Sequence, residues 1–154
     1  MAVADRLREL NVSLPPTPKP LASYIPAVQT GNLLIVSGQV PIEDGRVLHP
    51  GKLGAELSIE QGQEAARLCV LNALAAAQQA LGSLERVRRV LRVAGYVASA
   101  AGFTQQPAVI NGASDLLAEI FGEAGRHARV ALGTNELPLG CAVEIEFLFE
   151  VASA

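Results

Sequence analysis

Arg129 is the residue of this chain whose type and position most favour chemistry. It lies in a stretch with the alternation of a β-strand, where one face carries Ala128, Val130 and Leu132 and the other carries His127, Arg129, Ala131 and Gly133. An arginine inside a strand is either a solvated charge or a residue that holds an anion. Because its neighbours on the same face are small, there is room for its planar guanidinium to bind a carboxylate through two hydrogen bonds.

The last strand carries the second group with chemical potential. Apolar residues alternate with polar ones from Cys141 to Val151, and the polar face includes Glu144 and Glu146. We expect the apolar face to meet the helices, and we place Arg129 on the side of the carboxylates, away from the helices. An ion pair between Arg129 and Glu144 or Glu146 is therefore the alternative to a ligand-binding role.

The remaining candidates are few. His127 shares the face of Arg129, where it could donate a proton to a ligand or make a structural hydrogen bond. His49 is expected to be a loop residue, and Ser37 has no His–Asp pair that would make it a nucleophile. No histidines and carboxylates have the spacing of metal ligands, so we expect no metal and no cofactor.

Two segments precede and open the domain. Residues 2–10 could form a short helix, and four prolines (Pro15, Pro16, Pro18 and Pro20) then impose an extended path. We interpret residues 1–23 as an arm on the surface and residues 24–154 as one domain. Gly31-Asn32 and Asp44-Gly45 are turn signals, and the first predicts a hairpin between residues 24 and 40.

Helical periodicity replaces this pattern from Ser58 onward. Ser58 and Gln61 match a capping box, and Gly82 matches the end of the same helix. A β-rich stretch covers residues 86–98, a second helix begins near Pro107, and two strands close the chain. This order predicts an α+β domain with a mixed β-sheet and two helices packed on one face.

Bulk properties exclude several classes of protein. The chain has 154 residues and a net charge of −3, and half of its residues are apolar. No apolar run is long enough to span a membrane, and no signal peptide is visible, so we expect a cytoplasmic protein with Cys69 and Cys141 reduced and buried. The one basic run, residues 86–92, is interpreted as a solvated strand face, with RNA binding as the less favoured alternative. The surplus of apolar residues favours contacts between subunits.

Three stretches together resemble a known family. They are "YIPAVQTGNLLIVSGQVP" from Tyr24, "VINGASDLLAEIFGEAG" from Val109, and "HARVALGTNELPLGCAVEIEF" from His127. They are similar to the N-terminal hairpin, the second helix and the signature of the Rid family (reactive intermediate deaminase, also called YjgF or L-PSP). The resemblance covers Tyr24 to Val151, and the long arm resembles a branch of the family with chains of about this length.

The resemblance implies a chorismate-mutase-like fold, a barrel-like homotrimer and clefts between its subunits. It also implies hydrolysis of reactive enamines and imines, such as 2-aminoacrylate, to 2-keto acids and ammonia. By this resemblance Arg129 would bind the substrate carboxylate and Glu144 would help to position the attacking water. The pocket would be lined by Tyr24, Ser37, Gly38, Asn111, His127 and Ala131.

Two positions depart from the family pattern. His127 stands where many members have proline, and Ala131 stands where many have a cysteine that contacts the water. The retained Arg129 and Glu144 favour a deaminase, whereas Ala131 favours a trimeric binding module for small carboxylates or keto acids with little turnover. An endoribonuclease is disfavoured by the charge of the chain, and the expected partners are a small carboxylate-bearing imine or keto acid and further copies of the chain.

Overall fold

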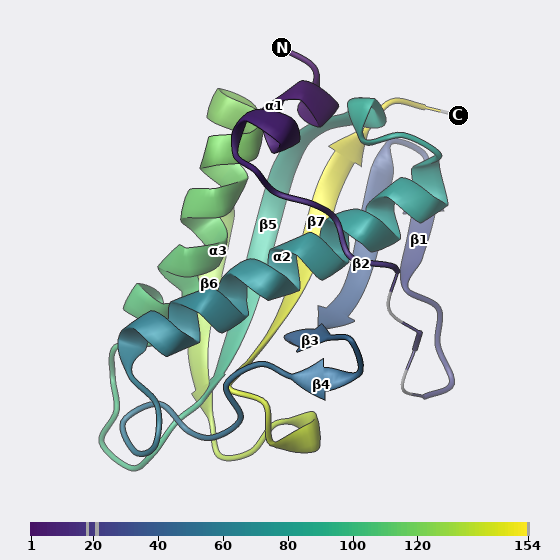
Figure 1. The fold of residues 1–154 in the computed structure, drawn as a ribbon. Helices are drawn as coiled ribbons and strands as arrows, with labels where there is room; N and C mark the ends of the chain where they lie inside the picture. Colours follow the sequence, from purple (N-terminus) through teal and green to yellow (C-terminus); the bar gives the residue numbers. More distant parts are fainter. Residues whose placement is uncertain (18, 21, 154) are drawn as a thin grey trace.

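A five-stranded sheet forms the back of the molecule. The computed structural model describes residues 1–17, 19–20 and 22–153, and Pro18 of the proline-rich segment and Leu21 lie outside them. The strand order is β1-β2-β7-β5-β6 (Figure 1). The strands are β1 (Ala27–Thr30), β2 (Leu33–Gln39), β5 (Val87–Ala98), β6 (Ala128–Thr134) and β7 (Val143–Val151). Only β5 and β6 are parallel, so the sheet is mixed, as predicted.

Two long helices cover one face of this sheet. They are α2 (Ile59–Leu81) and α3 (Gln106–Phe121), and α2 crosses the strands diagonally in Figure 1. The capping box of Ser58 and Gln61 begins α2, and Gly82 ends it in a left-handed conformation. The predicted α+β arrangement of two helices on one face is therefore confirmed.

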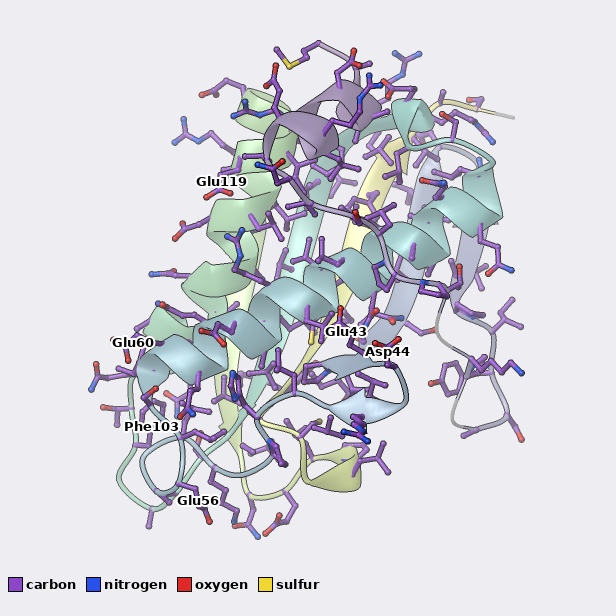
Figure 2. All side chains as sticks on the ribbon, in the orientation of Figure 1. Glu43, Asp44, Glu56, Glu60, Phe103 and Glu119 are labelled. Carbon is purple, nitrogen blue, oxygen red and sulfur yellow. The ribbon has the colours of Figure 1, made fainter. Side chains whose placement is uncertain are left out.

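A third, short helix lies at the start of the chain. The helix α1 (Val3–Glu9) packs on the end of α3, where the Arg6 Nε atom donates to the carbonyl of Glu119 at 2.7 Å. Figure 2 labels Glu119 at this end of α3. Leu7 is buried in this contact, which fixes the beginning of the arm to the domain.

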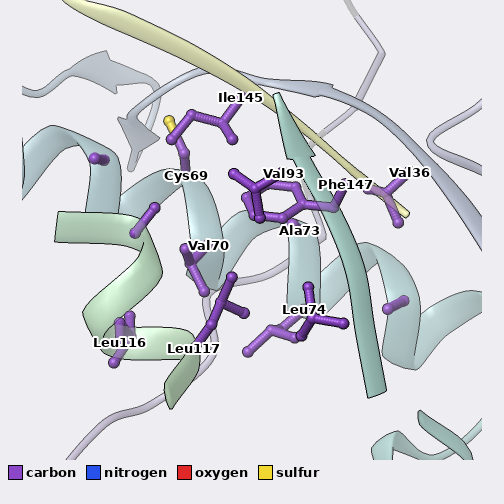
Figure 3. Close-up of a cluster of buried hydrophobic side chains, with 14 of the residues drawn as sticks. Val36, Cys69, Val70, Ala73, Leu74, Val93, Leu116, Leu117, Ile145 and Phe147 are labelled. Carbon is purple, nitrogen blue, oxygen red and sulfur yellow. The ribbon is translucent and has the colours of Figure 1, made fainter. Parts of the chain in front are cut away.

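The core lies between the two helices and the sheet. Figure 3 shows Val70 and Leu74 of α2 and Leu117 of α3 packed toward Val93 of β5 and Phe147 of β7. Close packing of this kind supplies most of the free energy that favours folding. Cys69 and Cys141 are both buried and both free, as predicted.

Tight turns join the remaining strands. Gly31 connects β1 to β2 with a positive φ of 55°, as the predicted hairpin requires. A small second sheet pairs β3 (Ile42–Glu43) with β4 (Arg46–Val47). Its turn places Asp44 and Gly45 at φ values of 51° and 74°, a pair that favours asparagine, aspartate and glycine.

The face of Arg129 was predicted wrongly. Residues paired side by side in a sheet share a face. Arg129 pairs with Val93, which pairs in turn with Phe147, and both of these belong to the core beneath the helices. Arg129 therefore points toward α3, whereas Val130 and Leu132 are 37% and 52% exposed on the other face.

The helix-free face of the sheet explains this error. Apolar side chains on it are exposed at Val28, Ile35, Val130 and Leu132. The alternation in β6 was correct, but the more apolar half of the strand was assigned to the core. Because the open face is also apolar, composition alone did not separate the two faces.

The basic run of residues 86–92 is largely engaged within the fold. The Arg86 guanidinium donates to the carbonyls of Leu81 and Ala152, each at 3.0 Å. Arg89 pairs with Glu150 at 2.9 Å on the open face. Arg88, Arg89 and Arg92 are exposed, in agreement with the interpretation of a solvated strand face, whereas Arg86 is turned into the fold. In the described part of the chain, no helix has the length and apolar character needed to cross a membrane.

Candidate functional site

Arg129 lies in a polar cluster between β6 and α3. Its Nη1 atom donates to Asn111 Oδ1 at 2.8 Å and to Ser114 Oγ at 3.2 Å. Its Nη2 atom lies 3.4 Å from the carbonyl oxygen of Pro107. These oxygens are all neutral, and Arg129 takes part in none of the ion pairs between described residues. A cation held by neutral acceptors keeps its charge available for an anionic ligand.

The hydrogen-bonding edges of Arg129 are used unequally. A guanidinium has five N–H donors in a fixed plane, and the three contacts above use Nη1 twice and Nη2 once, whereas Nε donates to no described residue. In any guanidinium, Nε–H and the neighbouring Nη2 hydrogen point in the same direction along one edge. Since a carboxylate binds such an edge through two parallel hydrogen bonds, Arg129 presents an anion-binding geometry.

His127 joins the same cluster through Ser114. Its Nδ1 atom lies 2.6 Å from the carbonyl oxygen of Gly125, and its Nε2 atom lies 2.9 Å from Ser114 Oγ. A carbonyl oxygen can only accept, so Nδ1 carries a proton. The sequence placed His127 beside Arg129 correctly, and the structure gives its ring nitrogens two protein partners.

Glu144 belongs to a second cluster on the other side of the sheet. It lines a cavity of about 40 Å³, together with Tyr24, Gly38, Gln39, Val40 and four further residues: Lys19, Pro20, Pro26 and Ile42. A buried water needs about 10–15 Å³, so this space has room for water. Three of the predicted site residues therefore meet here, namely Tyr24, Gly38 and Glu144.

Gly38 allows the carboxylate to lie against the backbone. A Cβ atom at Gly38 would lie 3.1 Å from Glu144 Cδ, closer than ordinary contacts allow. The neighbouring residue, Ser37, donates from Oγ to the carbonyl of Ile25 at 2.7 Å. This hydrogen bond connects β2 to the segment that precedes β1. Burial, and secondly the charge of Glu146, raise the pKa of Glu144 above its ordinary value.

Comparison with known proteins identifies the family. Residues 4–151 match the family model described as "YjgF/chorismate mutase-like, putative endoribonuclease". The chain belongs to the YjgF family. Protein TCP17 of Trypanosoma cruzi is 45% identical over 97% of this chain and 94% of its own length. RutC family protein PH0854 of Pyrococcus horikoshii is 30% identical over 84% of this chain and 87% of its own length.

Solved structures agree with this membership. The crystal structure of the protein Atu1372 from Agrobacterium tumefaciens superposes with a TM-score of 0.90 at 44% identity. The match covers 97% of this chain and 92% of that one. The YjgF fold, an α+β domain with a mixed sheet, is therefore shared along almost the whole chain.

In this YjgF chain the predicted site residues form two groups. Asn111, His127 and Arg129 meet on the helix side of β6. In the sheet, Tyr96 is the strand partner of both Glu144 and Leu132, so these three side chains share a face. Leu132 is exposed on the helix-free side, and Glu144 therefore faces that side too. The alternative ion pair of Arg129 with the carboxylates of β7 is wrong, because the opposite faces separate them and Glu146 instead pairs with Arg92 at 3.4 Å.

Ala131 lies on the face of Arg129, and two residues near the predicted site residues were not predicted. Ala131 is half-buried, follows Arg129 on the same face, and offers only a methyl group. Ser114 was missed, although its position three residues after Asn111 on a predicted helix was a usable signal. Lys19 was missed because nothing local in the sequence indicates that the arm reaches the Glu144 cavity. Among the described residues, no cluster of three His, Cys, Asp or Glu side chains could hold a metal ion.

Proposed function

We propose that this protein is a hydrolytic deaminase of small imines and enamines that carry a carboxylate. It converts them to 2-keto acids and ammonia. The site forms between copies of the chain in a homotrimer, where the Arg129 group of one copy meets the Glu144 group of another. The observation that carries this proposal is the guanidinium of Arg129, a cation that neutral oxygens hold in place and that forms no ion pair with a described residue.

The chemistry requires orientation more than a strong nucleophile. An imine beside a carboxylate is already electrophilic at carbon, and Arg129 would hold the carboxylate. A water oxygen forms a bond to the imine carbon, the C=N pair moves to nitrogen, and the nitrogen takes a proton. The carbinolamine then loses ammonia as the C=O bond forms, so one water is consumed for each ammonia released.

Glu144 supports the proton transfers. The raised pKa of its carboxyl group makes the carboxylate a better base toward the attacking water than an ordinary glutamate. The cavity beside it has room for that water. Arg129 and Glu144 thus supply the two functions that hydrolysis needs, a hold on the substrate and a base for the water.

The position of the two groups supports assembly from several copies. They lie on opposite faces of one sheet, so a single chain does not bring them together. The helix-free face also exposes apolar side chains (Val28, Ile35, Val130 and Leu132), which subunit contacts would bury. A cyclic trimer would repeat the contact three times and give three equivalent sites.

Mixing two inactive variants tests this arrangement directly. We expect Arg129→Ala and Glu144→Gln each to release no keto acid from enzymatically generated 2-iminobutyrate. After the two are unfolded and refolded together in equal amounts, random trimers should recover about a quarter of the wild-type activity, because each site needs one intact half from each chain. If the wild type is active but the mixture recovers no activity, the site is not shared between chains. The proposal that the protein is a deaminase would still hold.

A binding module with little turnover is the second candidate. Ala131 favours it, because a methyl group cannot hold a water in the way a polar side chain can. Such a module would bind 2-oxobutyrate through Arg129 but would not accelerate imine hydrolysis above the rate in buffer. Titration calorimetry with 2-oxobutyrate, beside the coupled assay, separates the two functions.

A further inference from the structure

We infer that Ser114 and His127 are positioning residues that fix the guanidinium of Arg129 for its ligand. His127 does not touch the substrate in this scheme and acts through Ser114. This inference rests on the proposed function only where its tests measure turnover or ligand binding. The geometry on which it stands is a chain of contacts from Gly125 through His127 and Ser114 to Arg129.

For the neutral imidazole of His127, the Gly125 carbonyl sets the direction of each hydrogen bond in this chain. The Gly125 carbonyl fixes the proton of His127 on Nδ1, at a distance of 2.6 Å. Nε2 of the singly protonated ring can then only accept, and its partner at 2.9 Å is the hydroxyl of Ser114. The Ser114 proton therefore points to His127, and its oxygen lone pairs remain for Arg129 Nη1 at 3.2 Å.

This order matters because a serine hydroxyl rotates freely. Without a fixed acceptor, its proton could point toward the guanidinium and remove the acceptor that Arg129 uses. His127 Nε2 accepts that proton in a hydrogen bond, so the lone pairs of the Ser114 oxygen stay turned toward Arg129 Nη1. Asn111 Oδ1 also accepts from Nη1, at 2.8 Å, so two acceptors at this nitrogen help to fix the plane of the whole group.

The consequence is a pre-oriented carboxylate site. The edge formed by Nε–H and Nη2–H can accept a carboxylate only when the guanidinium plane is correctly turned. Losing Ser114 would leave Nη1 with one acceptor and would let the plane swing. Losing one hydrogen-bond acceptor of a charged binding group is expected to weaken ligand binding by about 10-fold. We therefore expect weaker substrate binding with unchanged chemistry once substrate is bound.

Ser114→Ala is the first test. We expect KM for 2-iminobutyrate, and Kd for 2-oxobutyrate, to rise about 10-fold, while kcat changes less than about 2-fold. Ser114→Thr keeps the hydroxyl and should restore both constants. Ser83→Ala is the matched control, because it removes a serine hydrogen bond to Glu85 N at 3.2 Å far from Arg129. An unchanged Kd in Ser114→Ala, or an equal rise in Ser83→Ala, overturns the inference.

A double-mutant cycle tests whether His127 acts through Ser114. His127→Leu should raise Kd by a similar factor, and His127→Gln, which offers an acceptor oxygen, should largely restore it. The double variant Ser114→Ala with His127→Leu should be no weaker than Ser114→Ala alone. Additive effects would mean that His127 contacts the ligand itself, and they would overturn its positioning role.

Nitrogen NMR of His127 tests the geometry without any ligand. We expect the Nδ1-protonated tautomer, with Nε2 unprotonated, in the folded protein. The Nε2-protonated tautomer would reverse the chain of hydrogen bonds and would overturn the inference, whether or not the protein is a deaminase. If wild type neither turns over 2-iminobutyrate nor binds 2-oxobutyrate, the proposed function fails, while the tautomer still decides the geometry.

Discussion

At the scale of single residues, Arg129 offers the sharpest test because it has no anionic partner of its own among the described side chains. Arg129→Lys keeps the charge but loses the planar pair of donors. We expect the affinity for 2-oxobutyrate to fall by about 2–3 kcal/mol, which is roughly 30- to 150-fold. Calorimetric titration measures this change.

A suitable control for that variant is Arg89→Lys, which alters an exposed arginine paired with Glu150. Its affinity for the keto acid should equal that of wild type. Equal affinities in Arg129→Lys and wild type would show that Arg129 belongs to the scaffold. The carboxylate-binding role would then be lost.

Glu144 should show a conflict between stability and activity. Burial and Glu146 raise its pKa above 4.5 in the folded protein. The folded state therefore binds this proton more tightly than the unfolded chain, and the resulting stabilisation is present in acid and is lost as the pH rises through the raised pKa. Glu144→Gln stays neutral throughout, so we expect it to be more stable than wild type at neutral pH and inactive.

Urea unfolding at several pH values measures this effect. The stability difference between Glu144→Gln and wild type should shrink as the pH falls toward 4.5 and vanish below it. Wild-type activity should fall over the same acid range as the carboxylate takes up its proton. A variant that is less stable than wild type at neutral pH would contradict the stated cause of the raised pKa.

The sequence identified most of the candidate residues but not their neighbours. Arg129 was recognisable as a charge in a strand with small residues beside it, and Glu144 as a carboxylate on the polar face of the last strand. Their separation onto opposite faces could not be read from alternation, since a period of two gives two sets of residues without saying which one meets the helices. The partners Asn111 and Ser114 come from a helix that meets β6 only in the folded chain.

At the scale of elements, the crossing of α2 and α3 depends on two glycines. A Cβ atom at Gly112 would lie 2.4 Å from the backbone oxygen of Gln63, which cannot move without shifting α2. A Cβ atom at Gly62 would lie 2.9 Å from Val109 Cγ1 and 3.0 Å from Leu53 Cδ1, which are side-chain atoms of buried residues. The two positions therefore differ in how much strain the same substitution would create.

We expect Gly112→Ala to destabilise the protein by about 1–3 kcal/mol or more, despite the higher helix propensity of alanine. Gly62→Ala should cost less, because its contacts are longer and are made with side-chain atoms rather than with backbone. Thermal unfolding of both variants gives the comparison. A Gly112→Ala protein as stable as wild type would mean that the helices are not in the close contact described.

Elements governed by local signals were predicted well. The boundaries of α2 follow from Ser58, Gln61 and Gly82, whose capping chemistry lies within a few residues in the chain. The first hairpin likewise follows from a two-residue turn at Gly31. By contrast, the order β1-β2-β7-β5-β6 depends on which strands meet across the sheet, and local residues carry little information about it.

At the scale of the whole molecule, the helix-free face should determine the oligomeric state. We expect sedimentation of the wild type to show one species of three chains, each of 16.1 kDa. Ile35→Glu places a charge among apolar side chains of that face and should release monomers without deaminase activity. Gln78→Glu adds the same charge to the exposed side of α2 and should leave the trimer intact.

Monomeric wild type at micromolar concentration would contradict the proposed assembly, and a trimeric Ile35→Glu would show that this face is not the interface. The two variants carry the same added charge. The comparison therefore separates an effect of position from an effect of net charge.

The placement of Arg129 and Glu144 on opposite faces of one sheet also bears on gene dosage. In a trimer with shared sites, a chain lacking Arg129 would disable only the site to which it contributes that arginine, and the other two sites would work. A cell that expresses one intact and one defective allele would then lose activity in proportion to the defective chains. Two different loss-of-function alleles, one at each half of the site, could partly complement each other in the same cell.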